Sequence, residues 1–376
     1  MRFPGKIKLL LLTCTILCLG TGCTHDDADK LPYEAFVVSP SNGVTFAYEL
    51  FEKQIQITSN TNWSVTTENN DNWLTVTTNN GLITLKTLPN ETAETRTTNL
   101  VFSIPGSDPI LYPVKSLPLN RPKDELSMIT YNVKDGFAGR TGTTPNNTAV
   151  INRFKDFAKN QNPDIICYQE LNGYTADMLK SFAESLSIGH NYVEFFQVSS
   201  GKNLGISSKY PISDAVKNQS GMTNGLLIVS CCNVGFGITQ LNEDASENKR
   251  IQESNTIVEN MKSFASTKTL DGTIVCGDLH ALSSFDKSIY GSDKNYQTLD
   301  NFNINNYKGI YDILKTTVGE NTTNFTDATN YRYDHILVSP GLQTSCVSYG
   351  VITDTPTPNI SDHFPVKTII KVTKFK

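Results

Sequence analysis

The stretch Ser361-Asp362-His363-Phe364-Pro365-Val366 places a carboxylate beside an imidazole, directly before the apolar run Val366-Lys367-Thr368-Ile369-Ile370. That run is typical of a strand, so the Asp-His pair should lie at a loop-to-strand junction on one edge of a sheet. There the imidazole can exchange a proton, and the carboxylate can bind a metal or neutralise charge. An ordinary surface loop can contain the same pair, so the rest of the chain must decide between the two interpretations.

Four further predicted strands carry acidic, amide or imidazole side chains where they begin or end. These are Asn132 at the end of 126–133, Gln169 and Glu170 after 165–168, Asp278 and His280 after 273–276, and Asp334 and His335 at the start of 333–339. Each alone has a structural explanation; Asp278, for example, follows a glycine and would suit a helix N-cap. In open α/β sheets, however, functional groups gather where strands end. Five such strand ends in one domain favour a functional site.

Residues 125–374 alternate between helical and strand patterns. Apolar stripes predict helices near 150–157, 178–186 and 247–266, with irregular helical segments continuing to about residue 316. Apolar runs predict strands at 126–133, 165–168, 192–198, 203–208, 224–232, 236–241, 273–276, 333–339, 345–352 and 366–373. Strands interleaved with helices and hairpins predict a mixed α/β domain over this range.

Residues 30–118 have an all-β pattern instead. Runs rich in Val, Ile and Thr alternate with Asn- and Gly-containing turns and predict strands at 54–58, 63–65, 73–76, 82–85 and 99–104. Short strands at this spacing favour a small β-sandwich. The polar, proline-bearing segment 119–124 is the predicted linker to the α/β domain.

The β-region resembles a BACON domain, an Ig-like module. The resemblance rests on Ser59-Asn60-Thr61-Asn62-Trp63-Ser64-Val65, followed by Trp73-Leu74, Gly81, Asn90 and Arg96. It implies either contact with glycans or mucin or a role as a spacer. For the two tryptophans, packing in the sandwich core is favoured over a platform on which sugars stack.

The N-terminus has the pattern of an export signal. Basic residues precede the apolar run 9–19, which is too short for a confident membrane span. Small residues then lead to Cys23, and this order resembles the lipobox of a bacterial lipoprotein. The resemblance implies that residues 1–23 form a signal peptide with its lipobox and that Cys23 is acylated; an ordinary cleavable signal is the alternative. The acidic run 24–29 resembles the export signal of Bacteroidetes surface lipoproteins, so we expect a lipid anchor in the outer membrane, at the cell surface.

Overall charge narrows the partners. A net charge of −5 and a pI of about 5.6 argue against broad electrostatic docking onto nucleic acid, which requires many Lys and Arg side chains. A compact site that brings its own divalent cation remains compatible with this charge. Five of the eight cysteines lie beyond Cys23 without CxxC spacing, so buried thiols are favoured over zinc ligands or a disulfide framework. We expect a monomer.

The α/β region resembles the endonuclease/exonuclease/phosphatase superfamily, the fold of DNase I-like nucleases, neutral sphingomyelinases and inositol polyphosphate phosphatases. The resemblance rests on Tyr131-Asn132-Val133, Asp164-Ile165-Ile166-Cys167-Tyr168-Gln169-Glu170, Gly205-Ile206-Ser207-Ser208-Lys209-Tyr210-Pro211-Ile212, Arg250-Ile251-Gln252, Gly277-Asp278-Leu279, Tyr333-Asp334-His335-Ile336-Leu337-Val338-Ser339 and Ser361-Asp362-His363-Phe364-Pro365-Val366. It implies a four-layer α/β sandwich of two mixed sheets flanked by helices, over residues 125–374, and a Mg²⁺-dependent phosphoesterase activity.

The resemblance also implies roles for individual residues. Glu170 would be the main ligand of Mg²⁺, or of Mn²⁺, with Asn132 and Asp362 completing or supporting the site. Asp278 would orient or deprotonate the attacking water. His363 would bind the phosphate and offset the negative charge of the transition state, with its imidazole held by Asp334.

Two positions depart from the pattern of this superfamily. Gln240 stands in Thr239-Gln240-Leu241, where the family usually has His; an amide keeps hydrogen bonding but cannot donate a proton in catalysis. His280 stands where the family usually has an Asn that contacts the scissile phosphate, a contact that His can also make. These changes leave the predicted metal ligands in place.

Two hypotheses from different classes follow. The first is a surface-anchored, metal-dependent phosphoesterase, with nucleic acid, phospholipid headgroups and inositol phosphates as open substrate classes. The second is a catalytically degenerate member that acts as a glycan-binding surface lipoprotein. Hydrolysis of a model phosphodiester separates them.

Overall fold

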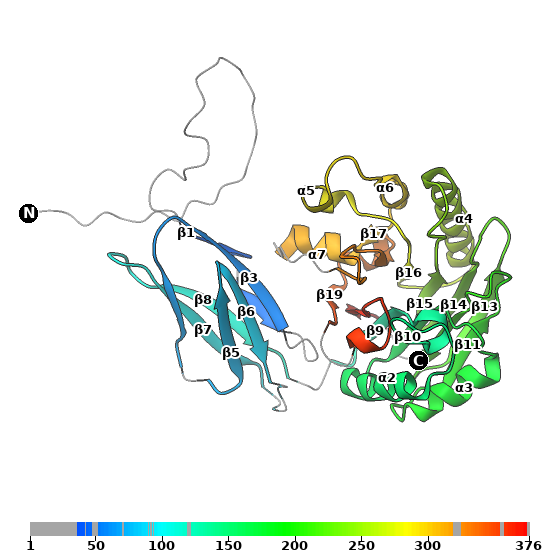
Figure 1. Cartoon of the computed structure of the whole chain (residues 1–376), viewed down its shortest axis with the longest axis horizontal. Helices are drawn as coiled ribbons and strands as arrows, with labels where there is room; N and C mark the ends of the chain where they lie inside the picture. Colours follow the sequence, from blue (N-terminus) through cyan, green and yellow to red (C-terminus); the bar gives the residue numbers. More distant parts are fainter. Residues whose placement is uncertain are drawn as a thin grey trace, which may run out of the picture. The chain divides into compact units, whose positions relative to one another are not determined.

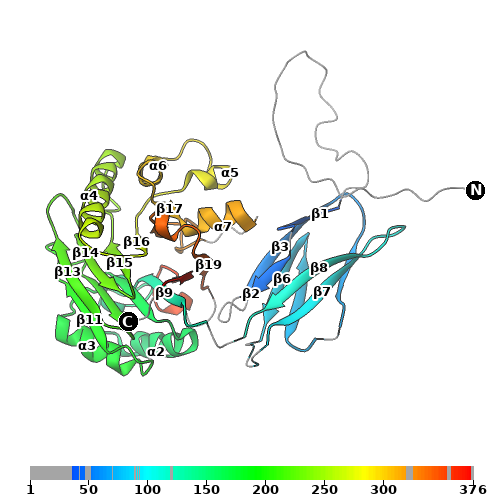
Figure 2. The ribbon, with the colours of Figure 1, turned by 180° about the vertical axis from the view of Figure 1, so that it is seen from behind.

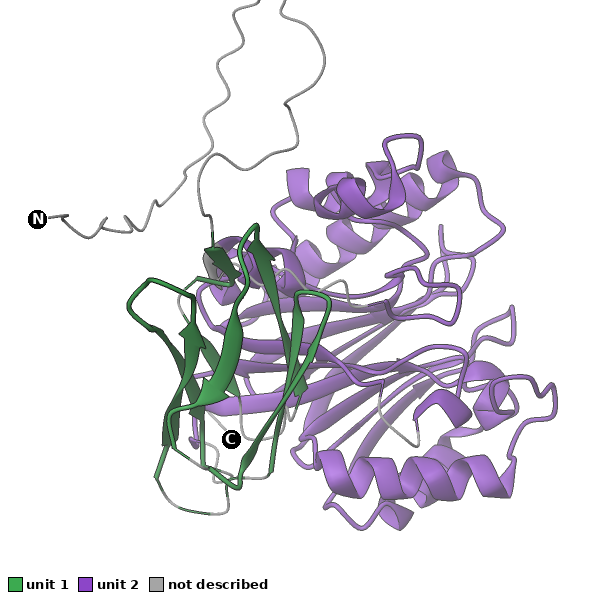
Figure 3. Ribbon diagram, turned by 60° about the vertical axis from the view of Figure 1, so that its left-hand side comes forward, with its two compact units in different colours: residues 1–120 green, residues 121–376 purple. Residues whose placement is uncertain are grey.

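The computed structural model describes residues 36–41, 43–46, 52–69, 71–88, 90, 92, 94–118, 122–318, 325–353 and 357–373. The chain forms two compact units, Met1–Asn120 and Arg121–Lys376, which Figure 3 colours separately. The predicted signal peptide and Cys23 lie outside the described residues. None of the helices within the described ranges is both long and apolar enough to cross a membrane.

Eight short strands build the first unit. They are β1 (Phe36–Ser39), β2 (Val44–Phe46), β3 (Glu52–Ser59), β4 (Ser64–Thr67), β5 (Leu74–Asn79), β6 (Leu82–Thr87), β7 (Arg96–Ser103) and β8 (Ile110–Ser116). They pair into two four-stranded sheets, in the orders β1-β3-β6-β5 and β2-β8-β7-β4. Apolar side chains from both sheets, Ile55 and Phe102 among them, form one core, and Trp63 and Trp73 pack against it. The predicted all-β character of this region is confirmed.

Two six-stranded sheets form the centre of the second unit. The first sheet has the order β11-β12-β10-β9-β20-β19 and the second the order β13-β14-β15-β16-β18-β17. The first contains β9 (Glu125–Asn132), β10 (Ile165–Gln169), β11 (Tyr192–Phe196), β12 (Leu204–Ser208), β19 (Cys346–Val351) and β20 (Val366–Lys371). The second contains β13 (Ile212–Asn218), β14 (Leu226–Cys231), β15 (Val234–Thr239), β16 (Gly272–Asp278), β17 (Lys308–Gly309) and β18 (Asp334–Val338).

Helices cover the outer face of each sheet, which gives four layers (Figures 1 and 2). On the first sheet, α2 (Thr148–Gln161) and α3 (Ala176–Ser185) bury Phe154 and Phe182 against Tyr168. On the second, α4 (Glu247–Ser266) and α6 (Gln297–Ile304) bury Met261 and Phe302. The remaining helices are α1 (Lys134–Phe137), α5 (Lys287–Tyr290) and α7 (Ile310–Val318). The predicted sandwich of two mixed sheets between helices is confirmed.

The alternation of side chains along the strands explains this layering. Leu126 and Met128 of β9 join the core between the sheets, whereas Ile129 and Tyr131 face the helices. Successive side chains of a strand point to opposite faces, so a strand buried on both faces is apolar throughout. Central strands such as β14 and β15 therefore read as nearly continuous apolar runs.

The strand directions place the ends of several strands at one common edge of the two sheets. In the first sheet β9 and β10 are parallel, and in the second β15 and β16 are parallel, so each pair ends at the same edge. The neighbouring strands β20 and β18 are antiparallel to β9 and β16, so they begin at that edge. The ends of four strands and the starts of two others consequently meet there.

Candidate active site

All eight side chains that the sequence predicted for the site lie at this edge. Asn132 ends β9, Glu170 follows β10, Gln240 follows β15, Asp278 ends β16 with His280 two residues on, Asp334 begins β18, and Asp362 and His363 precede β20. Seven of them form one network of hydrogen bonds and ion pairs. Asp362 adjoins that network through Ser361, whose hydroxyl donates to the Asn132 carbonyl at 2.8 Å.

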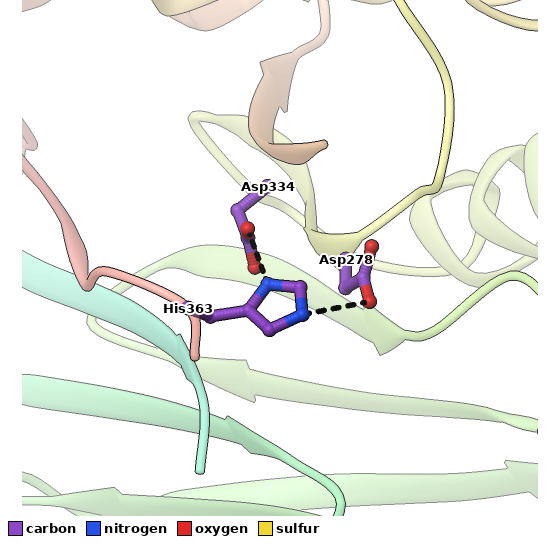
Figure 4. A group of neighbouring side chains, drawn as sticks. All are labelled: Asp278, Asp334 and His363. Atoms are coloured by element: carbon purple, nitrogen blue, oxygen red, sulfur yellow. Dashed lines mark hydrogen bonds and ion pairs between the residues drawn. The ribbon is translucent and has the colours of Figure 1, made fainter. Parts of the chain in front are cut away.

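His363 lies between two buried carboxylates, as Figure 4 shows. Its Nδ1 is 2.8 Å from Asp334 Oδ2, and its Nε2 is 3.8 Å from Asp278 Oδ2. The first contact is a short hydrogen bond, whereas the second is too long for one and leaves Nε2 available to another acceptor. Burial alone would lower the pKa of His363, but Asp334 and Asp278 outweigh it and hold the pKa well above its usual value. The imidazole is therefore positively charged at neutral pH.

The charge of Asp278 complements that of the imidazolium. Burial alone would raise the pKa of Asp278, but His363 and the hydrogen bonds from His280 outweigh it, so the pKa is lowered. Burial raises the pKa of Asp334 to about 6, against the attraction of His363. Both carboxylates therefore carry a negative charge at neutral pH, one on each side of the ring.

Glu170 and Asp278 share two amide donors. Asn132 Nδ2 donates to Glu170 Oε1 at 3.1 Å and to Asp278 Oδ2 at 3.3 Å. Gln240 Nε2 donates to the same two oxygens at 2.7 and 3.3 Å. Burial would raise the pKa of Glu170, but Lys202, Gln240 and Asn132 outweigh it and lower the pKa. Two buried, ionised carboxylates thus lie close together, separated by amide groups.

His280 is held against Asp278 and an aromatic ring. Its backbone N–H donates to Asp278 Oδ1 at 3.1 Å, and its Nδ1 lies 3.2 Å from the same oxygen. The ring stacks on Tyr333 with centroids 4.5 Å apart. Burial would lower the pKa of His280, but Asp278 outweighs it and raises the pKa. His280 therefore stabilises the ionised form of Asp278 through Nδ1, while its Nε2 lies 4.0 Å from Glu243 Oε2.

Two lysines that were not predicted from the sequence also lie in the site. Lys134 Nζ lies 2.7 Å from Asp362 Oδ2, and Lys202 Nζ lies 3.0 Å from Glu170 Oε1. Burial would lower the pKa of each lysine, but the neighbouring carboxylates outweigh it and raise both. The position of Lys134, two residues after the strand-end Asn132, was a usable signal; Lys202 lies in the β11–β12 loop, 32 residues after Glu170, and had none.

Local backbone geometry fixes the acidic side chains. Gly277 has φ +139°, and a Cβ there would lie 1.9 Å from the Thr239 carbonyl oxygen, so only glycine lets β16 run this close to the end of β15. Glu170 and His280 have left-handed φ values of 59° and 45°. Such conformations are costly for residues with a Cβ, and they concentrate at functional sites.

A buried ion network anchors the start of β18. Arg332 is buried, and its Nη2 lies 2.6 Å from Asp286 Oδ2 and 3.0 Å from Asp312 Oδ1. The Thr326 hydroxyl accepts a hydrogen bond from the backbone N–H of Asp334 at 2.9 Å. Because Asp334 follows Arg332 by two residues, these contacts fix the carboxylate that holds His363.

The oxygen-rich part of the site fits a hard divalent cation. Such ions prefer carboxylate and amide oxygens, and Glu170, Asp278 and Asp362 supply carboxylates. Gln240 Oε1 is buried and has no hydrogen-bond partner among the described residues, so one acceptor here is unused. Asn132 Oδ1 accepts from the Lys134 backbone N–H at 3.0 Å, which turns the predicted ligand atom toward the main chain. The roles of Asn132 and Asp362 in metal binding stay predictions.

A second group of ligand atoms is more compact. One atom each from Asp278, Asp334 and His363 lies within 4.8 Å of the others, a spacing that a metal could bridge. The raised pKa of His363 argues against this arrangement, because a protonated imidazole has no lone pair to give to a metal. We therefore interpret these three residues as an imidazolium between two carboxylates.

The chain is similar to known proteins in both sequence and fold. A sequence profile of the Endonuclease/Exonuclease/phosphatase family matches residues 129–363, more than half of the chain. A search of curated proteins found no match to the chain. Among solved structures, the 3′–5′ exonuclease from Neisseria meningitidis matches with a TM-score of 0.50 and 17% identity, over 65% of this chain and 100% of that one. This likeness shows the DNase I-like fold.

Two further solved structures match over a similar range. The AP endonuclease from Archaeoglobus fulgidus has a TM-score of 0.47 and 18% identity, covering 66% of this chain and 100% of that one. A 3′ phosphatase from Neisseria, bound to a product DNA hairpin, has a TM-score of 0.49 and 14% identity, covering 67% and 99%.

Proposed function

The chain belongs to the Endonuclease/Exonuclease/phosphatase family, and we propose that its second unit is a divalent-metal-dependent phosphoesterase whose attacking water is oriented and deprotonated by Asp278. Members of this family hydrolyse phosphate esters. One observation supports the proposal above the others: the His363 ring lies between the Asp334 and Asp278 carboxylates, and Asn132 connects Asp278 to the buried Glu170 by donating to both. A site built only for structural stability does not need three buried carboxylates at one strand edge, because each buried charge is costly.

A bound Mg²⁺, or Mn²⁺, held chiefly by Glu170 with Asn132 and Asp362 in support, would supply the positive charge that polarises a phosphoryl oxygen. Asp278 accepts the proton of the attacking water, and the hydrogen bonds from Asn132 and Gln240 fix the orientation of its carboxylate. The unpaired Gln240 Oε1 is an acceptor for the second hydrogen of that water.

His363 acts on the phosphate. Its Nε2–H, 3.8 Å from Asp278, is free to donate to a phosphoryl oxygen, and its positive charge offsets the negative charge of the transition state. Asp334 fixes the ring by accepting the Nδ1–H at 2.8 Å. Gln240, which has no titratable proton, contributes orientation rather than acid catalysis.

Hydrolysis of bis-p-nitrophenyl phosphate tests this proposal. The purified protein is assayed with Mg²⁺, with EDTA, and after Mg²⁺ or Mn²⁺ is restored, beside Glu170→Ala. Release of p-nitrophenolate that EDTA and Glu170→Ala both abolish supports a metal-dependent phosphoesterase. Equal background release in every sample contradicts it and favours the degenerate, glycan-binding alternative. DNA, RNA, sphingomyelin and inositol phosphates then distinguish the substrate classes.

We further propose a BACON-like first unit and a surface lipid anchor. Trp63 and Trp73 pack on the β-sandwich core and are partly exposed, so a sugar could still contact them. Equilibrium binding to mucin glycans tests this role, and absent binding leaves the unit a spacer.

Mass spectrometry of the membrane fraction tests acylation at Cys23; an unmodified soluble N-terminus contradicts the anchor. Size-exclusion chromatography with light scattering tests the expected monomer.

A further inference from the structure

The two lysines of the site are bound to the carboxylates that are predicted to hold the metal. Lys202 Nζ lies 3.0 Å from Glu170 Oε1, and Lys134 Nζ lies 2.7 Å from Asp362 Oδ2. Glu170 is nearly buried, with 8% of its side chain exposed, so Lys202 takes up one of the few directions from which a ligand can approach it. The chain thus places its own cations where the metal is expected.

The two ammonium groups come from separate segments and reach the site from its rim. Lys134 begins α1, directly after β9, whereas Lys202 lies in the β11–β12 loop. Their side chains are 30% and 27% exposed, so neither is locked inside the core. The second acidic neighbour of Lys202 is Glu243, at 3.8 Å and 54% exposed, a weak partner in water. Both lysines therefore have room to change partner.

An ammonium and a divalent cation compete for the same carboxylate. A Mg²⁺ ion binds a carboxylate oxygen at about 2.1 Å, so an ammonium kept on that oxygen would lie within roughly 5 Å of the metal. Like charges at this separation repel strongly in a partly buried site. Lys202 must therefore leave Glu170 Oε1 when a metal binds there, and it needs another anionic acceptor.

A phosphate group suits both lysines as that acceptor. A lysine ammonium is a compact charge with three donors on a flexible stem, and it forms strong hydrogen bonds with phosphate oxygens. We propose that Lys134 and Lys202 couple metal binding to phosphate binding: each ammonium occupies a metal-binding carboxylate until a phosphate arrives, then transfers to the phosphate and frees that carboxylate. This inference rests on the proposed function, because it assumes that metal and phosphate meet at this site.

The coupling has a reciprocal consequence. A phosphate that removes the lysines from the carboxylates strengthens metal binding, and the metal strengthens phosphate binding by the same factor. The free protein should therefore bind metal weakly, and metal and phosphate should bind tightly together. Lys134 and Lys202 would be positioning residues for the metal as well as direct contacts of the phosphate.

Equilibrium Mn²⁺ binding, followed by electron paramagnetic resonance with and without inorganic phosphate, tests the coupling without turnover. In the wild-type protein, phosphate should tighten Mn²⁺ binding by about tenfold, within the usual range for coupled sites. Lys202→Met should bind Mn²⁺ more tightly than wild type without phosphate, and phosphate should then add little. Lys134→Met should change in the same direction. Lys202→Arg keeps the charge and should retain the tightening by phosphate.

Lys209→Met is the matched control. Lys209 also pairs with a buried carboxylate, Asp164 at 3.3 Å, but outside the site, so its loss should leave Mn²⁺ binding unchanged. Unaltered Mn²⁺ affinity and unaltered phosphate effect in a folded Lys202→Met protein would overturn the inference, and phosphoesterase activity in the same preparation would leave the proposed function intact. Absence of Mn²⁺ binding in all proteins, with or without phosphate, would overturn both.

Discussion

Replacement of Asp334 by Asn isolates the role of the carboxylate behind His363. Asp334 is fully buried, and its Oδ2 accepts the Nδ1–H of His363 at 2.8 Å. Asn has nearly the same shape but no charge, so it keeps the packing and removes the negative charge that pairs with the imidazolium. Thermal unfolding should show that wild type and Asp334→Asn are both folded at 25 °C, so their activities can be compared at that temperature.

The size of the effect follows from that one hydrogen bond. A hydrogen bond to a charged group contributes about 1.5–3 kcal/mol. If that contribution is lost where charge develops, at about 1.36 kcal/mol per tenfold, kcat should fall by about 10- to 150-fold. KM should change much less, because Asp334 does not reach the substrate.

The pH profile gives a second, independent readout. Asp334 is one of the carboxylates that raise the pKa of His363, so its replacement should lower that pKa. His363 acts in its protonated form. As the pH is raised, the variant should therefore lose activity at a lower pH than the wild type does. An NMR titration of the His363 ring should show the same downward shift.

The control is Asp214→Asn on β13, outside the site, which removes a carboxylate that accepts a hydrogen bond from Ser230 of β14. It should change neither kcat nor the pH profile. A folded Asp334→Asn protein that retains kcat within threefold of wild type and loses activity at the same basic pH would contradict the role of Asp334 in holding His363.

Two further predictions concern stability. Burial lowers the pKa of His190 to about 4, so between pH 6.5 and 4 the unfolded chain binds a proton that the native protein excludes. The free energy of unfolding should therefore fall by about 2 kcal/mol from this residue as the pH drops from 7 to 5. In urea unfolding, His190→Gln should lack this part of the pH dependence. The same pH dependence in His190→Gln and wild type would refute the prediction. Arg332→Leu leaves Asp286 and Asp312 buried without their cation and should cost about 3–5 kcal/mol of unfolding free energy, whereas a loss below 1 kcal/mol would show that the network is not needed.

The sequence predicted the layered fold well where burial dictates residue type. The predicted helix at 247–266 has the same bounds as α4, and the apolar runs correspond to buried strands. Strand β13 escaped prediction because its sequence, ISDAVKN, is mostly exposed at a sheet edge and lacks an apolar run. An exposed edge strand of this composition therefore leaves no apolar run from which it could be predicted.

The site was partly predictable for a topological reason. Carboxylates and amides at strand ends were expected to meet, and the parallel pairs β9–β10 and β15–β16 bring Asn132 and Asp278 within hydrogen-bond distance. The contact between Asp334 and His363 was expected from the family resemblance, but the lysine partners of the carboxylates were not predictable, because they depend on three-dimensional approach. Lys202 and Glu170 are an example: nothing in a 32-residue separation indicates that their side chains touch.

The most direct test of the account is the rate of bis-p-nitrophenyl phosphate hydrolysis, with saturating Mg²⁺, by wild type and by Asp278→Asn. Asp278 is fully buried beside His363 and accepts hydrogen bonds from Asn132 and Gln240, so Asn should preserve its shape and abolish its basicity. A positioned general base contributes about 10²- to 10⁴-fold, so the account predicts a loss of that size in kcat from a protein that is still folded at the assay temperature. Equal rates for the two folded proteins would contradict it.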